Sequence, residues 1–163
     1  MKKVVSVLVL VCLLSAGAWF MFAPKPQAPE VTFQTLDEKT FATQDLRGKV
    51  VLVKFWATSC VTCMKQMPDT VKLYEEFSPQ GFDVVAVAMS YDPEEYVKHY
   101  VQSRQLPFTV ALDKTGEVAK AFDDVRLTPI AFLVGKDGSI IKKYLGNYDK
   151  QDLRNTVQAA LAS

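Results

Sequence analysis

The sequence predicts an α/β fold in which helices flank a central mixed β-sheet, and an apolar segment precedes this domain. Two observations predict it. From residue 31 onward, short apolar runs typical of buried strands alternate with stretches of helical period. A predicted antiparallel hairpin and a last helix then close the chain, which is typical of a mixed sheet. A length of 163 residues, 49% of them hydrophobic, suits one domain plus an accessory segment.

Residues 1–23 predict a transmembrane anchor. Lys2 and Lys3 precede the run 4–23, which contains no charged residue and has about the 20-residue length that spans a bilayer. The positive-inside tendency keeps the two lysines in the cytoplasm and places the rest of the chain outside. A cleaved signal peptide is the alternative, because Ala16-Gly17-Ala18 resembles a cleavage site. Both interpretations export the domain.

The segment after the anchor is predicted to be a linker. Residues 24–30 contain three prolines, a composition that favours a stiff, extended spacer. The folded domain is therefore expected over residues 31–163. Cys12 lies inside the apolar run behind Val11, where a lipoprotein signal needs a small residue, so we interpret it as an apolar residue of the anchor.

Four apolar runs predict strands that are buried on both faces. They are residues 50–55, which only Lys54 interrupts, and residues 82–88, 109–112 and 130–134. Gly135-Lys136-Asp137-Gly138 has the composition of a hairpin turn and predicts a further strand at residues 140–144.

Apolar residues at helical spacing predict three helices. The first contains Met64, Met67, Val71, Tyr74 and Phe77; the second Tyr96, Val97, Tyr100 and Val101; the third Leu153, Val157, Ala160 and Leu161. Asp92 precedes the second helix as a predicted capping acceptor, with Pro93 in its first turn.

Composition excludes several classes of function. Nineteen basic and 18 acidic residues are intermixed, so no basic patch for nucleic acid stands out. Three cysteines are too few for a disulfide scaffold. Zinc needs about four ligands, whereas the folded domain offers two neighbouring thiols and His99, on the polar side of its helix. We therefore expect no metal centre and no cofactor besides a redox-active cysteine pair.

Cys60-Val61-Thr62-Cys63 follows a predicted buried strand and begins a predicted helix, the context of a redox motif. Unpaired N–H groups and the positive dipole end of a helix stabilise a thiolate, lowering a cysteine pKa from about 8.5 to about 3.5–7.5. Cys60 is thus the predicted nucleophile. Cys63, one turn deeper, is predicted to resolve a mixed disulfide. Closing so short a loop stabilises little, which disfavours a purely structural bridge.

The sequence around this pair resembles a known family. Residues 51–63, Met67-Pro68, Leu127-Thr128-Pro129 and Asp137-Gly138 are similar to the membrane-anchored TlpA/ResA-like branch of the thioredoxin superfamily, and the similarity covers residues 31–161. It implies a thioredoxin fold with an N-terminal extension and an inserted strand–helix segment. It also implies a domain on the periplasmic side of a bacterial inner membrane, which reduces cysteine pairs, often in cytochrome c or copper-site assembly.

The resemblance assigns further site residues. Pro129 falls where the family has a cis-proline facing the dithiol, and Thr128 would lie over Cys60 and offer backbone polar groups to a client peptide. The alternative is that Pro129 only starts an edge strand. Trp56 is either a wall of the active site or ordinary core, and Pro68 is expected to kink its helix.

Three positions depart from the family pattern. Lys54 stands where thioredoxins carry a buried acid, and Gln66 where relatives often have glutamate, so two candidate proton acceptors for Cys63 are missing. We expect the Lys54 ammonium to reach the sheet edge; a buried one would instead favour thiolates. Ser59 replaces a tryptophan before the first cysteine.

The leading hypothesis is a reductase whose partners are client proteins with cysteine pairs and a membrane thiol-electron donor. A thiol peroxidase of the same fold is one alternative, although Ala57 stands where those enzymes carry threonine. A Cu(I)-binding metallochaperone is the other, because Cu(I) needs only soft thiolates.

Overall fold

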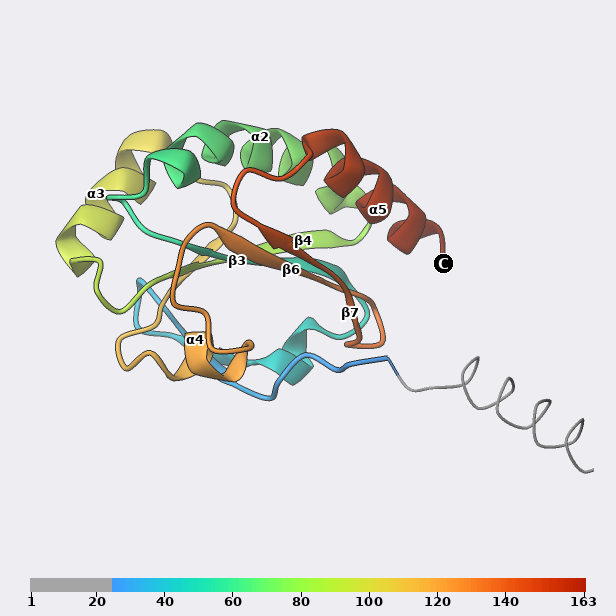
Figure 1. Ribbon diagram of the computed structural model, residues 1–163, viewed down its shortest axis with the longest axis horizontal. Helices are drawn as coiled ribbons and strands as arrows, with labels where there is room; N and C mark the ends of the chain where they lie inside the picture. Colours follow the sequence, from blue (N-terminus) through green and yellow to red (C-terminus); the bar gives the residue numbers. More distant parts are fainter. Residues whose placement is uncertain (1–24) are drawn as a thin grey trace, which may run out of the picture.

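The computed structural model describes residues 25–163, which form a seven-stranded mixed sheet between two layers of helices (Figure 1). The strand order is β2-β1-β5-β4-β3-β6-β7. Strands β3, β4 and β5 are parallel neighbours, whereas β6 runs antiparallel to both β3 and β7. The predicted mixed sheet is confirmed.

The strands are β1 (Thr32–Thr35), β2 (Thr40–Ala42), β3 (Val50–Trp56), β4 (Phe82–Ala88), β5 (Thr109–Leu112), β6 (Ile130–Val134) and β7 (Ile140–Leu145). The helices are α2 (Val61–Phe77), α3 (Glu94–Arg104), α4 (Glu117–Ala121) and α5 (Lys150–Ala162), with short 3-10 turns η1 (Thr43–Leu46) and η2 (Ser78–Gln80). The predicted strands and three predicted helices are present, while β1, β2 and α4 are additions to the prediction. Helix α2 continues across Pro68.

Strand β3 is the centre of the sheet, and all seven of its residues are buried. Because side chains alternate along a strand, it contributes to two cores. Val50, Leu52 and Trp56 pack on the side of α2, α3 and α5, and Val51, Val53 and Phe55 on the side of α4. Helices cover both faces (Figure 1), which explains the nearly continuous apolar sequence of β3.

The end of the predicted linker lies against the domain. The Ala28 N–H donates to the Gly138 carbonyl at 2.9 Å, and the Ile140 N–H donates to the Pro26 carbonyl at 2.7 Å. From Pro26 onward the segment pairs with the β6–β7 hairpin.

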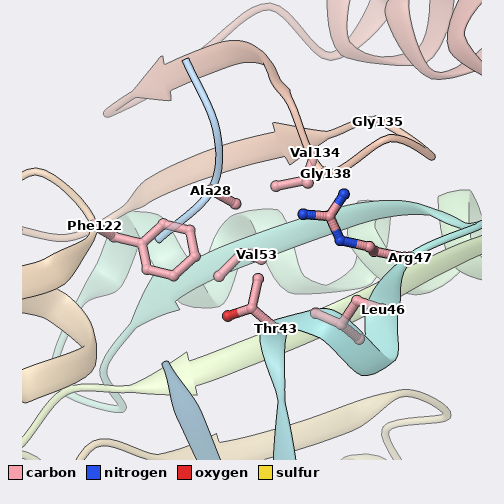
Figure 2. A pocket seen from close by; sticks show the side chains of 9 residues that line it. All are labelled: Ala28, Thr43, Leu46, Arg47, Val53, Phe122, Val134, Gly135 and Gly138. Carbon is pink, nitrogen blue, oxygen red and sulfur yellow. The ribbon is translucent and has the colours of Figure 1, made fainter. Parts of the chain in front are cut away.

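A small cavity lies beneath this docked segment. It encloses about 10 Å³ and is lined by Ala28, Thr43, Leu46, Arg47, Val53, Phe122, Val134, Gly135 and Gly138 (Figure 2). A cavity of this size holds one water molecule at most. We therefore regard it as a packing gap rather than a ligand site.

The predicted anchor and Cys12 lie outside the described residues. Within residues 25–163, no helix combines the length and the hydropathy that crossing a membrane requires.

Candidate active site

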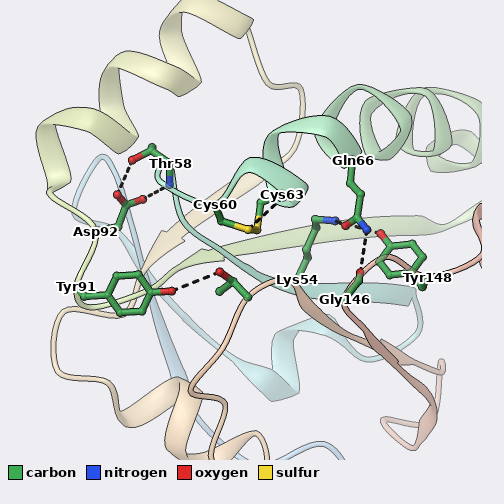
Figure 3. Close-up of a disulfide and its surroundings, with 10 residues drawn as sticks. Lys54, Thr58, Cys60, Cys63, Gln66, Tyr91, Asp92, Gly146 and Tyr148 are labelled. Carbon is green, nitrogen blue, oxygen red and sulfur yellow. Dashed lines mark hydrogen bonds between the residues drawn. A yellow bond between two sulfur atoms is a disulfide. The ribbon is translucent and has the colours of Figure 1, made fainter.

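The two cysteines lie at the junction of β3 and α2. Strand β3 ends at Trp56, a short loop follows, and Cys60 is the N-cap residue of α2. Cys60 and Cys63 form a disulfide (Figure 3), with their Cα atoms 5.2 Å apart. Residues three positions apart are neighbours on a helix surface, so the pair can close without unwinding α2.

The two sulfurs differ in their surroundings. Cys60 is partly exposed, whereas Cys63 is fully buried in the core beneath α2. The Cys63 backbone N–H donates to Cys60 Sγ at 3.2 Å. Such N–H groups at a helix start have no partner within the helix, so this one can stabilise a thiolate on Cys60. The arrangement supports Cys60 as the attacking cysteine and Cys63 as the resolving one.

Asp92, in the connection between β4 and α3, holds the loop that leads to Cys60. Its carboxylate accepts a hydrogen bond from the Thr58 N–H at 2.7 Å and one from Thr58 Oγ1 at 2.5 Å (Figure 3). The predicted role of Asp92 as the cap of α3 is wrong, because the N-cap is Pro93 and receives no side-chain hydrogen bond. Sequence reasoning missed this contact because it joins residues 34 positions apart.

The loop before β6 lies at the same end of the sheet. The Thr128–Pro129 peptide bond is cis, as the resemblance implied. Phe55 pairs with Ile130, so Pro129 and Thr128 come next to the end of β3, where the chain turns toward Cys60. Strand β6 has neighbours on both sides, which rules out the edge-strand alternative for Pro129.

Exposed apolar side chains surround this region. Val61 lies between the two cysteines and is 67% exposed, Leu127 precedes Thr128 and is 76% exposed, and Tyr91 is 55% exposed. The Tyr91 hydroxyl lies 3.4 Å from Thr128 Oγ1. Ser59 is also exposed. We refer to Val61, Tyr91 and Leu127 as the apolar rim.

The expectation that Lys54 reaches the sheet edge is wrong. Lys54 is 0% exposed, because β3 is the central strand and offers no nearby edge. Its Nζ atom contacts Gln66 Oε1 at 2.9 Å and the Tyr148 hydroxyl at 3.0 Å (Figure 3). Desolvation by burial lowers the pKa of the Lys54 amine to about 7, against a weaker opposing influence of the Asp69 charge.

Gln66 and Tyr148 complete this buried polar cluster. Gln66 Nε2 donates to the Gly146 carbonyl at 2.9 Å, which leaves Oε1 as the atom that faces Lys54. Burial also raises the pKa of Tyr148 to about 12, so its side chain is a neutral phenol near neutral pH. Tyr148 belongs to the loop between β7 and α5, and no sequence pattern pointed to it.

Trp56 belongs to the core rather than to an exposed wall of the site. It is fully buried in the same cluster as Cys63, and its ring packs against Tyr100 with the centroids 5.4 Å apart. Its Nε1 atom has no hydrogen-bond partner among residues 25–163. Trp56 therefore supports the site from beneath.

Within the part of the chain that the structure describes, no three His, Cys, Asp or Glu side chains come together as a metal site. His99 is exposed, as its helical position predicted.

Comparison with known proteins identifies relatives of this chain. A family model described as Redoxin matches residues 23–161. The thiol-disulfide oxidoreductase ResA of Bacillus thuringiensis subsp. konkukian is 34% identical over 127 residues, covering 78% of this chain and 72% of that protein. The protein of the same name from Bacillus subtilis is 32% identical over 146 residues, covering 85% of this chain and 80% of its own length.

Solved structures give the same picture. A putative thioredoxin from Neisseria meningitidis is similar with a TM-score of 0.79 and 36% identity, covering 86% of this chain and 93% of that one. A thioredoxin-family thiol:disulfide interchange protein from Chlorobium tepidum has a TM-score of 0.77 and 28% identity, with coverage of 85% and 98%. The thioredoxin fold with extensions is therefore confirmed.

Proposed function

This chain belongs to the redoxin family and is a ResA/TlpA-like thiol:disulfide oxidoreductase, and from that starting point we propose that it reduces client disulfides outside the cytoplasm. The two cysteines differ in their surroundings, and this difference indicates which of them attacks the client. Cys60 is partly exposed and accepts a helix-start N–H, while Cys63 is buried.

The proposed reaction has two exchange steps. The Cys60 thiolate attacks one sulfur of a client disulfide, which forms a mixed disulfide and releases the other client sulfur as a thiolate. The Cys63 thiolate then attacks Cys60 Sγ, closing the Cys60–Cys63 disulfide and releasing the second client thiolate. Two electrons pass to the client, and a membrane thiol-electron donor restores the dithiol.

The proposed client site consists of the apolar rim and the Thr128–Pro129 loop. An extended client segment would pair with the main chain at Thr128 while Val61 and Leu127 contact its apolar side chains. Thiol-disulfide oxidoreductases act on proteins that contain cysteines. We propose cysteine pairs of proteins undergoing cytochrome c or copper-site assembly as the client class, and an anchor at residues 1–23 with the domain on the periplasmic side.

The reduction potential of the full chain in detergent tests the direction of the reaction. We expect a couple more negative than about −200 mV, on the thioredoxin-like side of the known range. A value near about −120 mV, typical of an oxidant, would contradict a reductase.

Two serine variants test the roles of the cysteines. Cys60→Ser is expected to abolish reduction of a disulfide substrate, because the attacking thiolate is lost. Cys63→Ser is expected to accumulate mixed disulfides, visible as heavier bands on a non-reducing gel, whose captured partners identify the clients. Normal turnover by Cys63→Ser would refute its resolving role.

A further inference from the structure

Resolution of the mixed disulfide requires Cys63 to lose its proton inside the protein. Only the thiolate is nucleophilic, and burial disfavours a charged sulfur. Cys63 is fully buried, so its deprotonation needs an acceptor that shares the buried space. The inference below rests on the roles proposed above for Cys60 and Cys63.

Lys54 occupies that space. Leu52 and Trp56, its neighbours on the same face of β3, belong to the core cluster that contains Cys63, so the Lys54 side chain also rises from the sheet toward α2. In the view of Figure 3 it lies between the disulfide and Gln66. Gln66 is one helical turn after Cys63 on the buried side of α2.

The groups around the amine leave it without an opposite charge. The adjacent strands place Ala86 and Ala131 beside Lys54 in register. Helix α2 contributes the neutral amide of Gln66 and, farther off, Asp69, which forms an ion pair with Lys150 of α5. The loop before α5 contributes the phenol of Tyr148. Lys54 itself forms no ion pair within residues 25–163.

A small cavity lies next to the partners of Lys54. It measures about 40 Å³, enough for at least one water molecule. It is lined by Gln66, Asp69, Thr70, Leu73, Tyr148, Lys150 and Leu153. The side chains of Asp69 and Lys150 at its outer wall are 38% and 57% exposed. The cavity thus joins the buried cluster to titratable groups at the surface.

We propose that the neutral amine of Lys54 accepts the Cys63 proton during resolution, and that the cavity beside Gln66 and Tyr148 returns this proton to solvent. The Cys63 S–H bond breaks and an N–H bond forms on Lys54, giving an ammonium and a thiolate. The thiolate attacks Cys60 Sγ, and the client sulfur leaves with the electron pair of the broken S–S bond. Water in the cavity, next to Asp69, then takes the proton from the ammonium.

A basic group can replace the missing acid because it is buried. Burial places the pKa of Lys54 at about 7, so part of the population carries a free amine near neutral pH. The proton-accepting form becomes more abundant as pH rises through this value. A lysine that acted only as an ammonium attracting the thiolate would have the opposite dependence, since it would lose its charge over the same range.

Attack by Cys60 and resolution by Cys63 can be followed separately in a stopped-flow instrument when the reduced full chain reacts with one equivalent of dithiobis(nitrobenzoate). The protein carries Cys12→Ala, so that only Cys60 and Cys63 react. The first thionitrobenzoate is released by Cys60 and the second by Cys63. In the otherwise unchanged protein we expect the second phase to accelerate with pH through about 7. In Lys54→Met it should lose this inflection and be slower by about tenfold or more near neutral pH, with the first phase unchanged.

Lys49→Met is the matched control. Lys49 directly precedes β3 and pairs with Asp83 at the surface, so its loss should leave both phases unchanged. The inference would be overturned if Lys54→Met left the second phase unaltered or slowed both phases equally. It would also be overturned if the second phase of the parent protein slowed as the pH rises through about 7. Absence of a first phase that depends on Cys60 would instead refute the proposed roles of the cysteines.

Asp69→Asn tests the route to solvent. Resolution should still occur within one turnover, because Lys54 is intact, but its inflection with pH should move to lower pH, because the Asp69 charge no longer opposes the effect of burial on the Lys54 pKa. The rate of proton release after the second phase, followed with a pH indicator dye in weak buffer, should fall. An unchanged rate of proton release would overturn the exit through this cavity.

Discussion

Replacing Lys54 by methionine should stabilise the oxidised protein at low pH and destabilise it at high pH. The unfolded chain binds a proton on Lys54 up to about pH 10.5, whereas the folded protein releases it near pH 7. The unfolded state therefore holds more protons between these values, and stability of the wild type rises with pH over that window. Below about pH 7 the buried ammonium destabilises the fold in full.

The magnitude follows from the two pKa values. Their difference corresponds to about 5 kcal/mol of destabilisation at low pH. Methionine removes this penalty but leaves Gln66 Oε1 and the Tyr148 hydroxyl without their partner, which costs about 1–3 kcal/mol. Near about pH 6.5, Lys54→Met should thus be more stable by about 2–4 kcal/mol. This advantage should shrink by about 3 kcal/mol by about pH 9.5.

Urea unfolding followed by circular dichroism at a series of pH values measures this difference. The oxidised form is used so that Cys60 and Cys63 do not titrate. Lys49→Met serves as the control, since the pKa of this surface lysine is raised by its hydrogen bond to Asp83 and its loss should not mimic the trend. A stability difference between Lys54→Met and wild type that stays constant across this range would refute the assignment of a buried, titrating amine.

Three further predictions concern the surroundings of the site. Asp92→Ala should destabilise the protein by about 1–3 kcal/mol, because the Thr58 N–H loses its buried acceptor, and should slow the first phase of thionitrobenzoate release. Asp37→Ala, which removes an exposed ion pair, is the control, and an equal effect of the two substitutions would contradict the role of Asp92. Gly138→Ala should be less stable than Gly81→Ala in urea. Both glycines have positive φ, but a Cβ at Gly138 would lie 3.1 Å from the Arg47 guanidinium, whereas Gly81 faces open space; equal losses of stability in the two variants would argue against that contact. Leu127→Ser should raise the KM for a protein disulfide and leave both the first phase and stability unchanged, and an unaltered KM would remove Leu127 from the client surface.

The elements that carry the cysteines could be predicted from local sequence. The apolar run of β3 and the helical spacing from Met64 to Phe77 place Cys60 at a strand-to-helix junction without any knowledge of the sheet order. Strands β1 and β2 were missed because they lack the apolar run that identified the equally short β5, and helix α4 because five residues are too few for a helical period to be distinctive.

The errors arose where the answer depends on distant parts of the chain. Lys54 was expected at an edge because its burial is decided by β4 and β6, which flank β3 only in the folded sheet. Asp92 has the sequence context of a helix cap, yet its carboxylate is used 34 residues away at Thr58. Tyr148 lies 94 positions from Lys54, and the approach of these two residues follows from topology alone.

If residues 1–23 form the proposed anchor, the docked segment at Pro26–Ala28 would determine how far the dithiol stands from the membrane. This segment pairs with the β6–β7 hairpin, while Pro129 and Cys60 lie near the opposite end of β6. The five residues of β6 separate the two ends by about 17 Å. If residues 1–23 are held in a bilayer, the domain would have little freedom to pivot, with its hairpin toward the lipid and its cysteines toward the aqueous compartment. Soluble clients would then meet Cys60 directly, whereas a membrane-embedded donor would have to extend a domain of its own to reach it.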